Sequence, residues 1–184
     1  MVDDVRKLLV ESFRWVADAG TTSSGADRTG WLRNPIIAGR IGAVLADLVP
    51  GADATVVVGP ESSGLPLGAL VAHHLSTGFV AAGKKRRSLA DSDDWLSALT
   101  PLDYQGRIME LTLRRRLLAA GDRVLLVDDW ADTGGQLLAL HALVRDAGAR
   151  VAGTVVIVDG LKDHAVRRTL DLRSVLNVRE LRAR

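Results

Sequence analysis

The chain has 184 residues, of which 47% are hydrophobic and 25% are charged, the balance of a soluble globular protein with a sizeable core. It contains no cysteine, which excludes disulfides, thiolate metal sites and a thiol nucleophile. A net charge of +2 gives no support for nucleic acid as a partner. The charged N-terminus does not resemble a signal peptide, and the longest uncharged stretch, residues 62–83, is too polar to span a membrane. The expected location is the cytoplasm.

Apolar periodicity predicts two helices in the first part of the chain, with a polar loop between them. The first helix is expected over residues 3–19. The Gly, Ser and Thr content of residues 20–30 predicts the loop. The second helix is expected from Asn34, because the proline that follows it is favoured in a first turn, and it ends at the Pro-Gly pair of residues 50–51.

Predicted strands and helices alternate from residue 55 onward. The expected strands are 55–58, 78–82, 107–113, 124–127, 151–158 and 174–178, and the expected helices are 65–75, 135–147 and 161–169. Residues 83–107 show no clear period and are predicted to be a long functional loop or lid. The alternation predicts an α/β fold, a single domain whose parallel sheet is flanked by helices.

Two polar, glycine-containing loops directly follow predicted strands. The first is "GPESSG", residues 59–64, and the second is "DDWADTGG", residues 128–135. Ligands of a parallel sheet bind beyond the carboxyl ends of its strands. We therefore expect both loops to open at the same edge of the sheet.

The second loop combines two kinds of ligand-binding group. Residues 133–136 lie where a helix begins, and the free N–H groups and dipole of a helix N-terminus favour an anion such as phosphate. Asp128, Asp129 and Asp132 suit sugar hydroxyls, a cation or the water ligands of Mg²⁺. A strand-to-helix turn capped by Asp is the structural alternative, but three aspartates argue against it. The combination is what a ribose 5-phosphate requires.

The segment "VLLVDDWADTGG" resembles the signature with which type I phosphoribosyltransferases bind phosphoribosyl diphosphate (PRPP). Residues 56–87 are similar to the pyrophosphate loop, helix and basic strand end of that family, and residues 155–178 resemble the C-terminal part of its adenine and xanthine enzymes. The resemblance covers the chain from about residue 50 onward. It implies a type I phosphoribosyltransferase core with a small hood built from the N-terminal and C-terminal segments.

The resemblance also implies how this single domain, residues 1–184, is organised. Residues 1–50 would form N-terminal helices and the hood, and residues 51–160 the PRPP-binding core. Residues 161–184 would add a C-terminal strand and tail.

Carried over residue by residue, the resemblance implies a PRPP site in the second loop. Asp128 and Asp129 would hold the two ribose hydroxyls, with Mg²⁺ as the cofactor, bound through those hydroxyls or water. The residues implied to bind PRPP are Asp128, Asp129, Asp132, Thr133, Gly134, Gly135 and Gln136.

The first loop and the end of the next strand are implied to bind pyrophosphate. The residues concerned are Glu61, Ser62, Ser63, Gly64, Lys84 and Lys85. In the family this loop often carries a cis peptide bond. The chain departs from the family pattern at two places, with Ser63 in place of the arginine of Glu-Ser-Arg-Gly and Lys84 in place of the arginine of Arg-Lys. A lysine cannot make the bidentate contact of a guanidinium, so both departures indicate weaker pyrophosphate binding or an altered substrate.

Two acidic residues are candidates for the catalytic proton acceptor, because the attacking nitrogen must lose a proton. Asp132 occupies the position at which the hypoxanthine-guanine enzymes place an aspartate near the purine. Asp103, in "LDYQG", lies near the position of a catalytic glutamate in the adenine enzymes. Trp130 is expected to stack on the base, with packing under the loop as the alternative, and Trp31 in the hood to close over it.

The leading hypothesis is therefore a Mg²⁺-dependent enzyme that transfers 5-phosphoribosyl from PRPP to a nitrogen base, with a purine expected, and releases pyrophosphate. The alternative is a regulatory protein that senses PRPP or a nucleotide, which Ser63 and the Lys-Lys pair leave open. Asp132 favours a 6-oxopurine and the C-terminus favours the adenine and xanthine group, so the base stays open. The expected partners are PRPP and a nucleobase, without nucleic acid or membrane, and a homodimer is expected from the resemblance alone.

Two other enzyme classes share a short motif with the chain. "DTG" at residues 132–134 is typical of aspartic proteases, but a helix is predicted to follow it and no second copy exists. The glycine spacing of residues 59–64 matches a P-loop, but Leu65 and Pro66 stand where lysine and a hydroxyl residue are required. Both classes are excluded.

Overall fold

The computed structural model describes residues 2–17, 24–84, 94–102 and 106–182. Its helices are α1 (Val2–Ser12), α2 (Pro35–Ala46), α3 (Gly64–Leu75), η2 (Arg115–Leu117, a 3-10 turn), α4 (Gly135–Asp146), α5 (His164–Thr169) and α6 (Val178–Arg182). Its strands are β1 (Arg14–Ala17), β2 (Ser24–Asp27), β3 (Val56–Pro60), β4 (Gly78–Ala82), β5 (Trp95–Leu99), β6 (Glu110–Arg114), β7 (Arg123–Ala131), β8 (Arg150–Asp159) and β9 (Leu172–Asn177).

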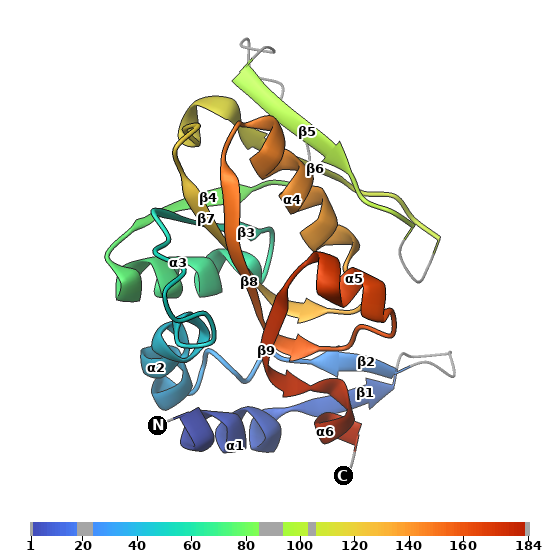
Figure 1. Cartoon of the computed structure of the whole chain (residues 1–184). Coiled ribbons are helices and arrows are strands. Elements are labelled where there is room, and N and C mark those ends of the chain that lie inside the picture. Colours follow the sequence, from blue (N-terminus) through green and yellow to red (C-terminus); the bar gives the residue numbers. More distant parts are fainter. Residues whose placement is uncertain (1, 18–23, 85–93, 103–105, 183–184) are drawn as a thin grey trace.

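A five-stranded parallel sheet forms the centre of the molecule, with strand order β4-β3-β7-β8-β9 (Figure 1). The strands β3, β7 and β8 are runs of apolar, largely β-branched residues without polar alternation, which suits strands covered on both faces. All five residues of β3 are buried. The predicted α/β fold with a parallel sheet flanked by helices is confirmed.

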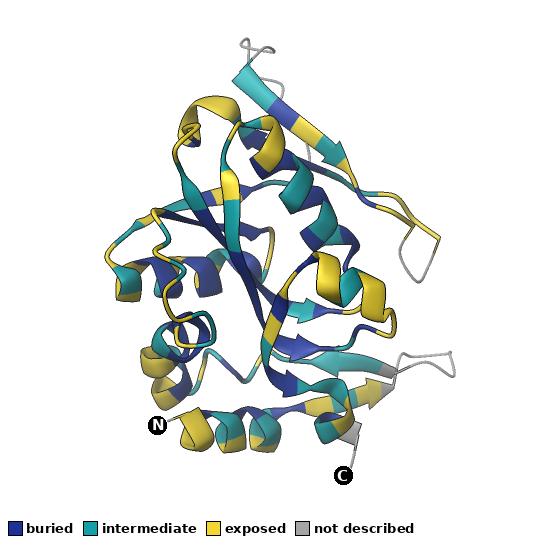
Figure 2. Cartoon of the chain, viewed as in Figure 1, coloured by how far each residue is buried: buried dark blue, intermediate teal, exposed yellow. Residues whose placement is uncertain are grey.

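Two apolar clusters cover the two faces of the sheet. The central strands between them are largely buried, dark blue in Figure 2. Along β7, Leu125 and Val127 pack into the cluster formed with α1, α2 and α3. Val124 and Leu126 point the other way, into the cluster formed with α4 and the β5–β6 hairpin. Neither face of β7 is left to solvent, so its polar end, rather than its flanks, is where a ligand can reach it. No helix in the described part of the chain is long and apolar enough to cross a membrane.

The N-terminal segment differs from the sequence-based prediction. The helix expected over residues 3–19 ends at Ser12. Strand β1 follows within the expected helix, and it pairs antiparallel with β2, which lies within the expected loop 20–30. Phe13 is buried and packs edge to face on Trp15, while Arg14 and Val16 are exposed. That alternation has the period of a strand and not of a helix. This hairpin and the turn that follows it, up to Asn34, are called the hood below.

The prediction of one long loop over residues 83–107 is also wrong. Strand β5 lies inside it and pairs antiparallel with β6, from Trp95 opposite Arg114 to Leu99 opposite Glu110. The hairpin packs on α4, and Leu96, Leu111 and Leu113 are buried there. The helix α6 after β9 was not predicted at all.

Acidification is expected to destabilise the protein through His141. The Nε2 atom of this half-buried residue of α4 lies 3.0 Å from the Thr154 hydroxyl of β8. Burial lowers the pKa of His141 below its usual 6.5, so the unfolded chain takes up a proton before the folded chain does. The stability contributed by neutral His141 is complete above about pH 6.5 and is lost as the pH falls through the folded-state pKa.

His141→Gln tests this expectation, because glutamine keeps a polar partner for Thr154 but does not titrate. Thermal unfolding between about pH 7.5 and about pH 5.5 is expected to show a smaller fall in melting temperature for this variant than for the wild type. His74→Gln, at an exposed position of α3, is the matched control. Equal falls in the wild type and His141→Gln would contradict the prediction.

Candidate active site

Three loops meet at the carboxyl edge of the sheet, and two of them are the loops that the sequence predicts there. The strand β3 lies between β4 and β7 and runs parallel to both, so the loops after Pro60, Ala82 and Ala131 emerge side by side. The Glu61 N–H donates to the Ala82 carbonyl at 2.9 Å, and the Lys84 N–H donates to the Glu61 carboxylate at 3.0 Å. The carboxylate of Glu61 therefore ties two loops together and places the Lys84 side chain at this edge.

The loop after β3 is shaped by close backbone packing. A Cβ atom on Gly59 would lie 2.3 Å from the Gly64 carbonyl oxygen, and one on Gly64 would lie 2.5 Å from the Pro60 ring. Glycine is required at both positions. The peptide bond between Glu61 and Ser62 is cis, as the family resemblance predicts.

The loop after β7 delivers a helix N-terminus to the same edge. Gly134 caps α4 with φ +78° and ψ 0°, a left-handed conformation that favours glycine. In the first turn of α4 the Gly135 N–H makes only a long contact, 3.3 Å, with the Thr133 hydroxyl. A Cβ atom on Gly134 would lie 2.7 Å from Cγ1 of Val166 in α5, so this turn is also backed by the C-terminal part of the chain. N–H groups of this kind bind phosphate.

A buried acidic pair ends β7. Asp128 and Asp129 are 4% and 7% exposed, and the Asp129 N–H donates to Asp128 Oδ1 at 2.8 Å. Burial, and then the neighbouring charge of Asp129, raise the pKa of Asp128 well above its usual value. Arg28, from the hood, forms an ion pair with Asp129 Oδ2 at 2.8 Å. The end of β7 thus holds two adjacent buried carboxylates, and that of Asp129 is paired with the guanidinium of Arg28.

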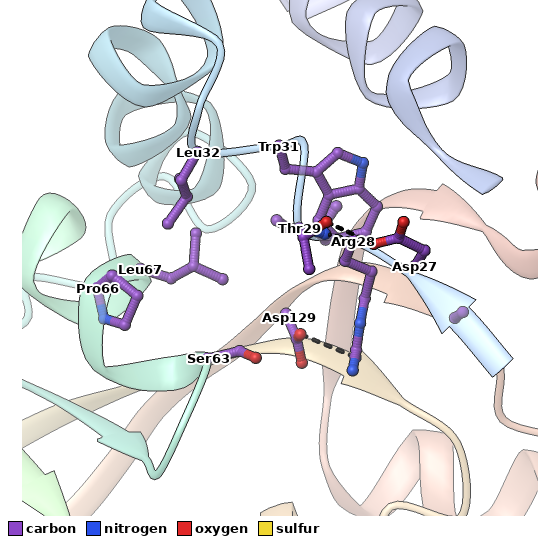
Figure 3. A pocket seen from close by; sticks show the side chains of 11 residues that line it. Asp27, Arg28, Thr29, Trp31, Leu32, Ser63, Pro66, Leu67 and Asp129 are labelled. Atoms are coloured by element: carbon purple, nitrogen blue, oxygen red, sulfur yellow. Dashed lines mark hydrogen bonds and ion pairs between the residues drawn. The ribbon is translucent and has the colours of Figure 1, made fainter. Parts of the chain in front are cut away.

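Two cavities lie against this pair. The loop cavity, about 370 Å³, is lined from Lys84, from the segment between β5 and β6, and from the β7–α4 loop. The hood cavity, about 280 Å³, lies between the hood and the start of α3 (Figure 3). Asp128 faces the loop cavity and Asp129 faces the hood cavity.

Most of the predicted PRPP residues gather around the loop cavity. Its lining includes Lys84, Asp128, Asp132, Thr133, Gly134, Gly135 and Gln136. The side-chain Oε1 of Gln136 is buried there and has no hydrogen-bond partner in the described part of the chain. Ser63 lines the hood cavity instead. Lys85 and Asp103 lie outside the described residues, so their predicted roles stay predictions.

The two tryptophans expected to contact a base lie on different cavities. Trp130 lines the loop cavity and packs on Phe13 and Trp15 at 6.0 Å between ring centroids. Trp31 lines the hood cavity, is only 3% exposed, and donates its indole N–H to the Leu9 carbonyl at 3.0 Å. The polar edge of Trp31 is therefore occupied, and only its apolar surface remains for a ligand.

Sequence reasoning missed several residues of the two cavities. Arg28 lies in a short turn that has no periodic pattern. Its ion pair with Asp129 joins positions about a hundred residues apart, and no local sequence pattern predicts such a contact. Thr100 and Arg107 line the loop cavity from the stretch expected to be one long loop, and Met109 lines it from the expected strand 107–113. The Thr100 hydroxyl accepts from the Met109 N–H at 3.0 Å and holds the two sides of this segment together.

Comparison with known proteins identifies the family. The family model described as "Phosphoribosyl transferase domain" matches residues 31–180. The chain belongs to this family. The match spans both loops of the candidate site, so the phosphoribosyltransferase signature read from residues 124–135 is not an isolated motif.

Relatives of this phosphoribosyltransferase include adenine and xanthine enzymes. The chain is 32% identical to an adenine phosphoribosyltransferase of Parafrankia sp., over 83% of this chain and 81% of the relative. It is 30% identical to a xanthine phosphoribosyltransferase of Brevibacillus brevis, over 68% of this chain and 64% of the relative. The crystal structure of the adenine phosphoribosyltransferase from Rhodothermus marinus superposes with a TM-score of 0.80 at 29% identity, covering 95% of this chain and 99% of that one.

Proposed function

We propose that this phosphoribosyltransferase transfers 5-phosphoribosyl from PRPP to a purine base, with Mg²⁺ as cofactor, and releases pyrophosphate. The observation that carries the proposal is the loop cavity, where a helix N-terminus, the buried carboxylate of Asp128 and Lys84 meet at one edge of the sheet, with Asp129 next to Asp128 on the hood cavity. These are the groups that a sugar bearing a phosphate at one end and a diphosphate at the other requires. The adenine and xanthine enzymes among its relatives support a purine as the acceptor.

Each end of PRPP has a partner in the proposed site. The amides of residues 133–136, at the N-terminus of α4, bind the 5-phosphate, and Asp128 and Asp129 accept from the ribose hydroxyls. The β3–α3 loop and Lys84 contact the diphosphate. In the reaction the bond from C1 of the ribose to the diphosphate oxygen breaks, a bond from C1 to a ring nitrogen forms, and the proton of that nitrogen passes to a base.

The donor set fits a Mg²⁺ ion held jointly with the substrate. In the described ranges, no three His, Asp or Glu side chains are grouped so that they could hold a metal ion by themselves. Asp128 and Asp129 are two carboxylates beside a phosphate site, and Mg²⁺ is commonly bound by one or two carboxylates together with water and substrate oxygens. When bound, the ion neutralises charge that develops on the leaving diphosphate.

Asp132 is the proposed proton acceptor. Its side chain is exposed and lines the loop cavity beside Trp130. We expect Asp132→Asn to lower kcat by about 100-fold, the usual size of a general-base contribution, while KM for PRPP changes little. Steady-state kinetics with varied PRPP measures both. A rise in KM for PRPP with unchanged kcat would place Asp132 on PRPP instead of on the base.

A pyrophosphate-release assay tests the proposed function. The protein, PRPP and Mg²⁺ are combined with adenine, hypoxanthine, guanine, xanthine or a pyrimidine. Release with at least one purine is the expected result. Tight PRPP binding without release for any base would favour the second candidate, a PRPP-sensing regulator. This second candidate is supported by Ser63 and Lys84, which stand where the family pattern has arginines. Without those arginines, the site is expected to bind pyrophosphate less tightly.

The proposal also includes a homodimer, which the family resemblance implies, and the cytoplasmic location expected from the sequence. Analytical ultracentrifugation of the purified chain measures its mass in solution. A sedimenting species of about twice the chain mass is expected, and a monomer at all concentrations would contradict this part of the proposal.

A further inference from the structure

Arg28 alone, among the described residues, lines both the hood cavity and the loop cavity. Its guanidinium lies beside the Asp129 carboxylate (Figure 3), at 2.8 Å from Oδ2. Its Cζ atom is 5.9 Å from the ring centroid of Trp130. The side chain thus reaches from the hood to the end of β7 and forms the partition between the two cavities.

The backbone that carries Arg28 is held in a defined turn. The Asp27 carboxylate accepts from the Thr29 N–H at 2.9 Å and from its hydroxyl at 2.7 Å. The Trp31 N–H donates to the Arg28 carbonyl at 3.1 Å, and the Trp31 ring itself is buried. These contacts fix the direction from which the guanidinium approaches Asp129.

The ion pair sets which carboxylate oxygens remain for a ligand. Arg28 binds Oδ2 of Asp129, and the Asp129 N–H binds Oδ1 of Asp128. In the ranges that the structure describes, this leaves Oδ1 of Asp129 and Oδ2 of Asp128 without an N–H or cationic donor at hydrogen-bond distance. A ribose presents two neighbouring hydroxyl donors, and each of these adjacent residues keeps one carboxylate oxygen as an acceptor.

Charge balance also points to Arg28. Two buried carboxylates repel each other, and a guanidinium that contacts one of them offsets this repulsion. The loop after β3 offers Ser63 where the family pattern has arginine, and Ser63 lines the hood cavity opposite Arg28. Arg28 is the one cationic side chain among the described residues of the hood cavity, so the guanidinium comes from the hood and not from that loop.

We propose that Arg28 is a positioning residue for the ribose of PRPP. By holding Oδ2 of Asp129, it turns Oδ1 toward the ribose hydroxyls, and it joins the hood to the ribose site through one ion pair. This inference rests on the proposed function, because it assigns a role within PRPP binding.

The test compares ribose 5-phosphate with inorganic phosphate as probes, by calorimetric titration in the presence of Mg²⁺. Arg28→Gln is expected to weaken binding of ribose 5-phosphate by about 10-fold and of inorganic phosphate by less than about 2-fold, because the phosphate site on α4 is untouched. The affinity of Arg28→Lys for ribose 5-phosphate is expected to lie between those of the wild type and Arg28→Gln, because an ammonium keeps the charge but not the paired N–H donors of a guanidinium. Arg33→Gln, an exposed arginine five residues along the chain, is the matched control and is expected to bind like the wild type.

A double-mutant cycle separates positioning from a general structural effect. In the Asp129→Asn background, Arg28→Gln is expected to change binding of ribose 5-phosphate by less than about 2-fold, because its effect passes through Asp129. In turnover assays of the single variant, KM for PRPP is expected to rise more than kcat falls.

The outcomes separate the role of Arg28 from the proposed function. Wild-type affinity for ribose 5-phosphate in Arg28→Gln, or an undiminished effect in the Asp129→Asn background, would overturn the role of Arg28. A rise only in the KM for the base would place the guanidinium on the base and overturn it as well. If the wild type itself binds neither PRPP nor ribose 5-phosphate, the proposed function fails and the inference fails with it.

Discussion

Asp128→Asn is expected to lower PRPP turnover by about 10- to 100-fold without lowering the melting temperature. Loss of one charge-assisted hydrogen bond to a ribose hydroxyl costs about 1.5–3 kcal/mol, which corresponds to this range of rates. In the folded chain, Asp128 is buried next to Asp129, where a charge is costly. Asparagine removes that charge and keeps the Oδ1 acceptor that the Asp129 N–H uses. Steady-state kinetics and thermal unfolding measure the two effects.

Asp159→Asn provides the contrasting control. Asp159 is also about as buried, at 7% exposed, and also ends a strand of the sheet, β8. Its carboxylate, however, is bound by both Nε and Nη2 of Arg167, at 2.6 Å and 3.1 Å. We expect this variant to lose stability, by about 1–3 kcal/mol, because it leaves a partly buried guanidinium without its anion. A fall in melting temperature for Asp128→Asn as large as for Asp159→Asn would show that Asp128 serves the fold.

Gly134→Ala is expected to impair both stability and phosphate binding. At φ +78° an alanine costs about 1–2 kcal/mol, and its Cβ would lie 2.7 Å from Val166, so the turn or α5 must shift. A shift of this turn moves the N–H groups at the start of α4. Calorimetric titration with inorganic phosphate and thermal unfolding are the measurements, and the expected loss of affinity is about 10-fold or more.

Gly51→Ala separates the two causes. Gly51 has the same φ, +78°, but nothing lies within 4 Å of the position of its Cβ. It is expected to show the conformational cost alone. Adding Val166→Ala to Gly134→Ala removes the contact atom and is expected to restore part of the melting temperature. Equal losses for Gly51→Ala and Gly134→Ala, with phosphate affinity kept, would show that the contact with α5 has no role.

The parallel sheet and its ligand-binding edge could be predicted because their signals are local. Runs such as Thr55–Val58 and Val124–Val127 have no polar alternation, and each is followed at once by a polar, glycine-containing loop. The acidic pair and the Thr-Gly-Gly turn lie within one short segment. They are therefore close in space because they are close in the sequence. The same holds for the start of α4 at Gly135.

The hood could not be predicted, because its structure depends on contacts distant in sequence. The apolar spacing of residues 3–19 fits a helix, but Phe13 and Trp15 pack on Trp130, which only the fold brings near. Strand β5 is likewise stabilised by β6 and α4 rather than by its own sequence. The Arg28–Asp129 ion pair joins the hood to β7 and has no local signature.

The placement of the tryptophans gives the molecule an intrinsic optical reporter. Trp130 lines the loop cavity with a guanidinium 5.9 Å from its ring centre, whereas Trp31 is buried with its N–H already bonded. A ribose bound to the carboxylates beside Arg28 is expected to change the electrostatic surroundings of Trp130 and to leave those of Trp31 almost as they were. The part of the fluorescence emission that Trp130→Phe removes from the signal of the four tryptophans is therefore expected to follow occupancy of the ribose site, without a label or a coupled reaction.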